Sequence, residues 1–167
     1  MVWIAVPEPE GGAFSEDCAR WALGELDALD ARAGDGARRV RRWLDAATLP
    51  LGADEARGLR RRAAALSRDE LHDLARAILI YRALLEQTPS DRETLADLAV
   101  VCGEADRLPE MLELRREELR LADSTERRLL LRLDVARIVG EIERRGGRIE
   151  ALRANLDEAP GHGPSLE

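Results

Sequence analysis

The chain has 167 residues, of which 45% are hydrophobic and 35% charged, and its net charge is −7 at pH 7. This composition is typical of a folded helical protein with room for one domain, and it argues against a disordered chain. The acidic balance also argues against a general affinity for nucleic acid. No apolar run reaches the roughly 20 residues that span a bilayer, so we expect no membrane segment.

The two cysteines, Cys18 and Cys102, are far apart and belong to no C-x-x-C pattern. A disulfide framework or a zinc site is therefore not expected. We expect a reducing, cytoplasmic setting. We also expect both thiols to be buried and unreactive, because reactivity requires exposure and a lowered pKa.

The first part of the chain is predicted to be less regular than the rest. Residues 1–13 contain two prolines and a Gly-Gly pair and are interpreted as an irregular lead-in. Residues 14–52 are predicted to form a divergent helical hairpin, broken by Gly34-Asp-Gly36. Its first helix has Trp21 and Leu29 near one face.

From residue 53 to residue 160 the apolar spacing predicts three more regular helical hairpins. Ser90 and Glu93 have the spacing of a capping box at the start of one of their helices. Residues 161–167 are interpreted as a tail or the start of a further repeat. The predicted helices span residues 54–70, 73–88, 91–104, 108–122, 125–144 and 148–158.

A degenerate repeat is clearest where Ala77, Tyr81, Leu84 and Pro89 form an A-x3-Y-x2-L-x4-P pattern. Pro160 closes a weaker copy, two periods of roughly 34 to 36 residues further along. A period of this length indicates stacked helical hairpins. We therefore predict an all-α fold, an α-solenoid of antiparallel hairpins with about eight helices.

These residues resemble the tetratricopeptide repeat family, whose pattern is W-x2-L-G-x2-Y, then A-x3-F, then P. Ala77, Tyr81 and Pro89 match the second half of one repeat. The resemblance covers roughly residues 54–160. The first half of the next repeat is matched at Leu95, Leu98 and Ala99.

Several positions depart from the family pattern. Cys102 stands where the family prefers tyrosine, which indicates a thiol that fills the core. Met111 replaces the small alanine of the second helix, and Arg115 stands where an aromatic residue is expected. The departures leave the repeat class recognisable, and they say nothing about biological role.

The resemblance implies a right-handed superhelix whose concave face is lined by the first helix of each hairpin. It further implies a non-enzymatic scaffold that binds a helix or extended segment of a partner protein. On the best-matched hairpin, the groove residues would be Glu93, Ala96, Val100 and Gly103. The alternative is a structural spacer or self-associating fragment of a larger array.

Arginine is concentrated in one segment. Residues 36–62 contain eight arginines and three acidic residues, whereas residues 1–35 contain two arginines and eight acidic residues. The arginines could serve an anionic partner, pair with the preceding acidic segment, or form a solvated face. Nucleic acid is the least expected ligand, because few aromatic residues are present to stack on bases. The candidate anion-binding residues are Arg38, Arg41, Arg42, Arg57 and Arg61.

The chain offers little for catalysis. It has two histidines, His72 and His162, which removes most acid–base and nucleophilic schemes. We expect both to lie in turns rather than to bind a metal, and neither belongs to a phosphate-binding motif. The sequence therefore predicts no enzymatic activity, no metal and no cofactor.

Overall fold

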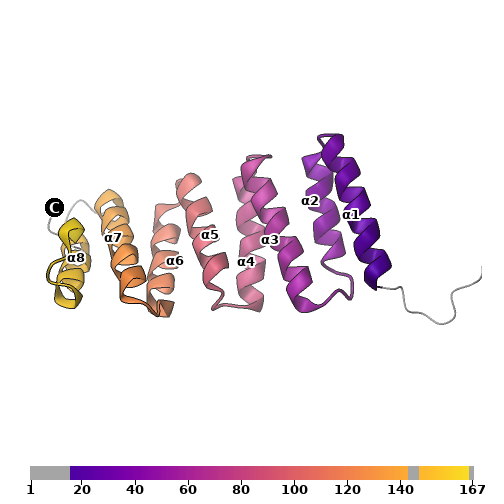
Figure 1. The fold of residues 1–167 in the computed structure, drawn as a ribbon. Helices are drawn as coiled ribbons and strands as arrows, with labels where there is room; N and C mark the ends of the chain where they lie inside the picture. The colour runs from indigo at the N-terminus through magenta and orange to yellow at the C-terminus, as the bar shows by residue number, and fades with distance from the viewer. Residues whose placement is uncertain (1–15, 143–146, 166–167) are drawn as a thin grey trace, which may run out of the picture.

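The computed structural model describes residues 16–142 and 147–165 (Figure 1). These residues form eight α-helices and one short 3-10 helix, with no strand. The lead-in predicted for residues 1–13 lies outside them. The helices are α1 (Glu16–Arg32), α2 (Gly36–Ala46), α3 (Ala53–Asp69), α4 (Leu74–Gln87), α5 (Arg92–Glu104), α6 (Leu108–Leu121), α7 (Thr125–Ile142), α8 (Gly147–Glu158) and η1 (Gly163–Ser165).

The helices stand side by side in chain order, from α1 at one end to α8 at the other (Figure 1). Each packs mainly against the helices next to it in the chain. Helices α1 and α2 fall within residues 14–52, α3 to α8 within residues 53–160, and η1 in the final segment. The predicted all-helical class is therefore confirmed for the described residues. None of these helices combines the length and apolarity needed to cross a membrane.

Aspartate side chains cap the N-termini of three helices. The carboxylates of Asp35, Asp73 and Asp91 each accept a hydrogen bond from the backbone N–H three residues later, over 2.9, 3.0 and 3.3 Å. Asp91 rather than Ser90 therefore caps α5, and the predicted capping box is wrong by one residue. Aspartate and serine cap helices about equally well, and Glu93 pairs with Arg61 instead.

Small side chains occupy the core where neighbouring helices approach each other. Ala63, Ala77 and Ala99 have no exposed surface. Larger side chains fill the space beside them, and Tyr81 of the A-x3-Y pattern is only 2% exposed. The helices can approach because alanine adds almost no side-chain bulk between them, so the burial of these residues agrees with the repeat pattern. The largest fully buried apolar side chains are Ile78, Leu98, Leu131, Ile138, Val40 and Val101.

The two cysteines differ in burial. Cys102 is fully buried in α5, and desolvation raises the pKa of its thiol to about 11, so the thiol stays protonated at neutral pH. Cys18 is exposed on α1, so the expectation of a buried thiol is wrong there. Trp21 and Leu29 of the same helix are 68% and 55% exposed. Among the described helices, α1 has one main packing neighbour, α2, which leaves much of its surface uncovered by them.

A buried ion pair replaces the aromatic residue expected in α6. Arg115 is 8% exposed, and its Nη1 donates to Oε1 of the buried Glu118 over 2.5 Å. The other oxygen of Glu118 accepts from Arg127 over 2.9 Å. A buried charge is tolerated when it is paired and hydrogen-bonded, so this network accounts for the departure from the family pattern.

The repeat register can be tested on two adjacent residues of α4. Tyr81→Ala removes a buried aromatic ring, and we expect a loss of about 3 to 5 kcal/mol in the free energy of unfolding. Arg82→Ala removes an exposed side chain whose ion-pair partner is Glu110, and we expect a loss below about 1 kcal/mol. Urea unfolding followed by circular dichroism measures both. Equal, small losses would show that Tyr81 does not face the core.

Candidate functional site

Ion pairs join successive odd-numbered helices along one side of the row. In each pair an arginine of one helix contacts a carboxylate of the next odd-numbered helix, 32 to 36 residues later in the chain. These contacts connect α1 to α3 and α3 to α5. We call this surface of α1, α3, α5 and α7 the odd-helix face. The pairs are Arg20–Glu55 at 2.9 Å, Arg61–Glu93, Arg61–Asp97 at 3.1 Å and Arg68–Glu104 at 2.8 Å.

The series of ion pairs stops at α5. Within the described residues no ion pair joins α5 to α7. A pocket of about 440 Å³ lies between α5, α6 and α7 instead. Its apolar lining is partly or fully buried, whereas its charged lining residues are largely exposed. We call it the α5–α7 pocket. It is lined by Val100, Gly103, Leu108 and Met111, and by Glu104, Asp106, Arg137 and Glu141.

The structure separates the four predicted groove residues, which all lie on α5. Val100 and Gly103 line the α5–α7 pocket. Glu93 lies at the other end of the helix and pairs with Arg61, while Ala96 between them is partly buried. A methyl group on Gly103 would meet the sulfur of Met111 at 3.0 Å, so the glycine allows Met111 to lie close to the α5 backbone.

Six of the eight residues that line the pocket were not among the predicted candidates. Among them, Met111 is only a departure from the family pattern in the sequence, and no sequence motif includes Arg137 or Glu141. Arg137 donates to Glu141 over 2.9 Å within α7. Their place beside Val100 depends on how α7 packs relative to α5, which no local pattern specifies.

The five candidate arginines divide into two groups. Arg57 and Arg61 of α3 are engaged by other helices or their ends, since Arg57 donates to Thr88 over 3.3 Å and Arg61 pairs with α5. Arg38, Arg41 and Arg42 lie on α2 and line a groove between α1 and α2. The five therefore do not act as one surface.

Part of the arginine-rich segment pairs with the acidic segment before it. Arg39 donates to Asp27 over 2.9 Å, and Arg42 donates to the buried Asp30 over 2.8 Å. The guanidinium of Arg39 also lies 4.9 Å from the ring centre of Trp43, a cation–π distance. These contacts fasten α2 to α1 and account for much of the local charge asymmetry.

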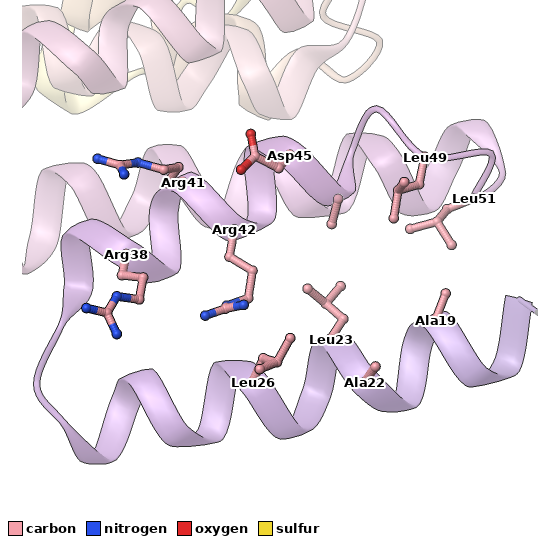
Figure 2. A pocket seen from close by; sticks show the side chains of 11 residues that line it. Ala19, Ala22, Leu23, Leu26, Arg38, Arg41, Arg42, Asp45, Leu49 and Leu51 are labelled. Carbon is pink, nitrogen blue, oxygen red and sulfur yellow. The ribbon is translucent and has the colours of Figure 1, made fainter.

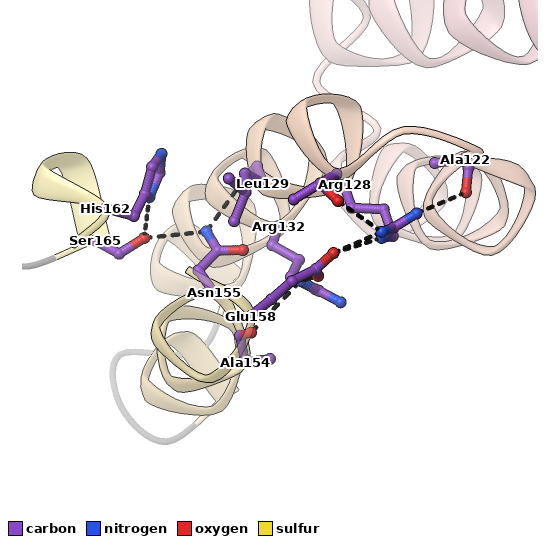
Figure 3. Close-up of polar contacts among 10 residues, drawn as sticks. Ala122, Arg128, Leu129, Arg132, Ala154, Asn155, Glu158, His162 and Ser165 are labelled. Atoms are coloured by element: carbon purple, nitrogen blue, oxygen red, sulfur yellow. Dashed lines mark hydrogen bonds and ion pairs between the residues drawn. The ribbon is translucent and has the colours of Figure 1, made fainter. Parts of the chain in front are cut away.

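A polar network closes the C-terminal end of the described chain (Figure 3). The fully buried Asn155 donates to the Leu129 carbonyl over 3.2 Å and to the Ser165 hydroxyl over 3.0 Å. The same hydroxyl lies 2.8 Å from Nδ1 of His162. These contacts hold η1 to α8 and α7. They also give the His162 ring a partner within the fold, the Ser165 hydroxyl.

The second half of the network is ionic. Glu158 of α8 accepts hydrogen bonds from Arg128 over 2.6 Å and from Arg132, both on α7 (Figure 3). These bonds lower the pKa of the Glu158 carboxyl from 4.5 to about 2. The carboxylate therefore stays ionised well below neutral pH and links the last two helices.

The described residues contain no cluster of side chains suited to a metal ion. No group of three or more His, Cys, Asp and Glu side chains that could hold a metal ion lies among them. His72 lies in the turn between α3 and α4 with a φ of 51°, as the sequence predicts. Among the hollows of the described surface are the α5–α7 pocket, whose lining is partly apolar and partly charged, and a groove beside α1.

Comparison with known proteins does not add an identity. No protein-family model matches this sequence, and no curated protein shows significant sequence similarity to it. The resemblance to tetratricopeptide repeats therefore depends on the residue pattern described above and stays a prediction.

The lowered pKa of Glu158 predicts how its contribution to stability depends on pH. A carboxyl whose folded pKa is lowered stabilises the fold above its unfolded pKa, here about 4.5, and this contribution disappears as the pH falls toward about 2. We therefore expect Glu158→Gln to melt below the wild type at pH 7 and this difference to shrink between pH 4.5 and pH 3. Thermal melts at pH 7, 5 and 3 measure it.

Glu113→Gln is the matched control for this prediction, because Glu113 makes one exposed pair with Arg116 on its own helix. Its melting temperature should stay close to that of the wild type at every pH. Identical melting of the wild type and Glu158→Gln at pH 7 would contradict the predicted role of Glu158.

Proposed function

We propose that this protein is a non-enzymatic scaffold of the tetratricopeptide repeat kind, which binds a segment of a partner protein on a concave face. In this proposal the helices form an α-solenoid with a right-handed superhelix, and the odd-numbered helices line its inner face. Two observations support it. Each helix packs mainly on its chain neighbours, and the ion pairs of the odd-helix face recur after 32 to 36 residues, close to one repeat.

The α5–α7 pocket is the observation on which the proposed binding role rests. Between α1 and α5 several charged side chains of the odd-helix face are paired with each other, so a partner would have to displace or desolvate them. The pocket offers apolar surface instead, at Val100, Gly103 and Met111. Its volume of about 440 Å³ lies within the range of small ligand pockets, which suits an apolar side chain and the backbone beside it.

The charges around the pocket favour a protein over a nucleic acid. Three carboxylates, Glu104, Asp106 and Glu141, line the pocket with one guanidinium, Arg137. Phosphate groups would be repelled by this excess of negative charge. We accordingly propose a peptide segment with an apolar anchor as the ligand, and a cytoplasmic location, with which the two free cysteines are consistent.

The second candidate function is that of a structural spacer. One observation favours it: several charged groups of the odd-helix face between α1 and α5 are paired within the chain and are therefore less available to a partner. A spacer needs only the stacking of its helices, and it would show no selective peptide binding.

Peptide selection distinguishes the two functions. A displayed library of random twelve-residue peptides is selected on the wild-type chain, and the affinities of enriched peptides are then measured for two variants. Val100→Arg places a charge in the pocket, so we expect at least a tenfold loss of affinity. Leu79→Arg is the matched control, because Leu79 is an exposed apolar residue of α4 that does not line the pocket.

The selection also has contrary outcomes. Enriched peptides that bind Val100→Arg as tightly as the wild type would contradict the proposed pocket. Failure to enrich any peptide would favour the spacer. Circular dichroism of both variants confirms that each is folded before affinities are compared.

A further inference from the structure

Helix α1, like α8 at the other end of the row, has little of its surface covered. Among its residues with described side chains, only Asp30 is buried. Leu26, Leu29 and Trp21 are all exposed, although these side chains are apolar. Apolar side chains gathered on one helix are a feature of surfaces that bind another molecule.

Some of this apolar surface borders a groove between α1 and α2, about 450 Å³ in volume (Figure 2). We call it the α1–α2 groove. At one end, Ala19, Ala22 and Leu23 of α1 lie across from Leu49 and Leu51, which follow α2 (Figure 2). Because these side chains are all apolar, this end of the groove suits the apolar side chains of a ligand.

The other end of the groove is basic. Arg38 and Arg42 of α2 extend toward α1 near Leu26 (Figure 2). Nη2 of Arg42 forms an ion pair with Oδ2 of Asp30 at 2.7 Å. Arg38 contacts Asp35 through Nε at 3.1 Å, but its side chain is 62% exposed, and its Nη1 has only a long contact of 3.8 Å to Asp30.

A further arginine of the groove has no ion-pair partner among the described residues. Arg41 is exposed and lines the groove one helical turn after Arg38. Asp45 is the one carboxylate among the lining residues. Arg38 and Arg41 therefore keep guanidinium N–H groups that can donate to a carboxylate, the charged group that arginine binds in a two-pronged geometry.

We propose that the α1–α2 groove binds a short acidic amphipathic segment of a partner protein. Its apolar side chains would lie against Leu23, Leu49 and Leu51, and a carboxylate at its other end would pair with Arg38 and Arg41. The apolar and basic ends of the groove together fix the direction in which the segment lies. This site is separate from the α5–α7 pocket and does not depend on its role.

Charge distinguishes this ligand from a second copy of the chain. Away from α1 and the groove, the most exposed leucines are Leu79 and Leu130. Leu79 has Arg76 and Arg82 three residues away on each side, whereas Leu130 has both arginine and carboxylate neighbours on its helix. Seating Leu79 in the groove would bring arginine close to arginine, which opposes self-association through that leucine.

The test uses a fluorescein-labelled twelve-residue peptide with leucines on one helical face in its first half and three glutamates in its second half. Binding to the full chain is followed by fluorescence anisotropy. A second peptide with glutamine in place of each glutamate reports the contribution of charge. We expect the glutamate peptide to bind at least tenfold more tightly, with an affinity that falls as salt rises.

Two variants locate the binding on the chain. Ala22→Glu places a carboxylate in the groove, and we expect it to reduce the affinity at least tenfold. Ala28→Glu is the matched control, because Ala28 is a partly buried alanine of the same helix that does not line the groove. Arg41→Gln should weaken binding and reduce its salt dependence, and Val100→Arg should leave it unchanged.

Four results would overturn the proposal. They are no binding of the glutamate peptide, equal binding of the two peptides, unchanged binding by Ala22→Glu, and a dimer in sedimentation that Ala22→Glu dissociates. Tenfold tighter binding after deletion of residues 1–13 would also overturn it, since the chain's own N-terminal segment would then be the occupant.

Discussion

Close contact between neighbouring helices is the interaction on which the other features of this protein depend. Ala63, Ala77 and Ala99 have no exposed surface, and each lies in a helix that packs mainly on the helices before and after it. Because alanine occupies little space, these helices can approach while Tyr81 and other large side chains fill the spaces beside them. The spacing of the odd-numbered helices, and so the position of every ion pair between them, follows from this packing.

Ion pairs between the helices add to this packing and do not replace it. Exposed ion pairs such as Arg20–Glu55 and Arg68–Glu104 each contribute at most about 1 kcal/mol, so they align the odd-numbered helices more than they hold the fold together. The two candidate binding sites lie at different places in the row of helices. The α5–α7 pocket lies beyond the last ion pair between odd-numbered helices, and the α1–α2 groove lies where α1 has a single main packing neighbour among the described helices.

Local patterns predicted the helices well, because apolar spacing and helix breakers act within a few residues. They also predicted the burial of Tyr81 and Cys102. Local patterns failed for features that depend on packing between distant parts of the chain. Cys18 is exposed because α1 lacks a second main neighbour among the described helices, and Arg137 joins the pocket only through the packing of α7 beside α5. The cap at Asp91 was missed for a local reason, since two adjacent residues are both good caps.

The packing of small residues between helices is tested most directly by enlarging one of them. Ala77→Leu adds bulk at a position of α4 with no exposed surface, whereas Ala83→Leu makes the same change at an exposed position of the same helix. In urea unfolding, Ala77→Leu should lower the free energy of unfolding by about 1 to 3 kcal/mol. Ala83→Leu should change it by less than about 0.5 kcal/mol, because surface substitutions have small effects. Equal free energies of unfolding for the two variants would contradict the account.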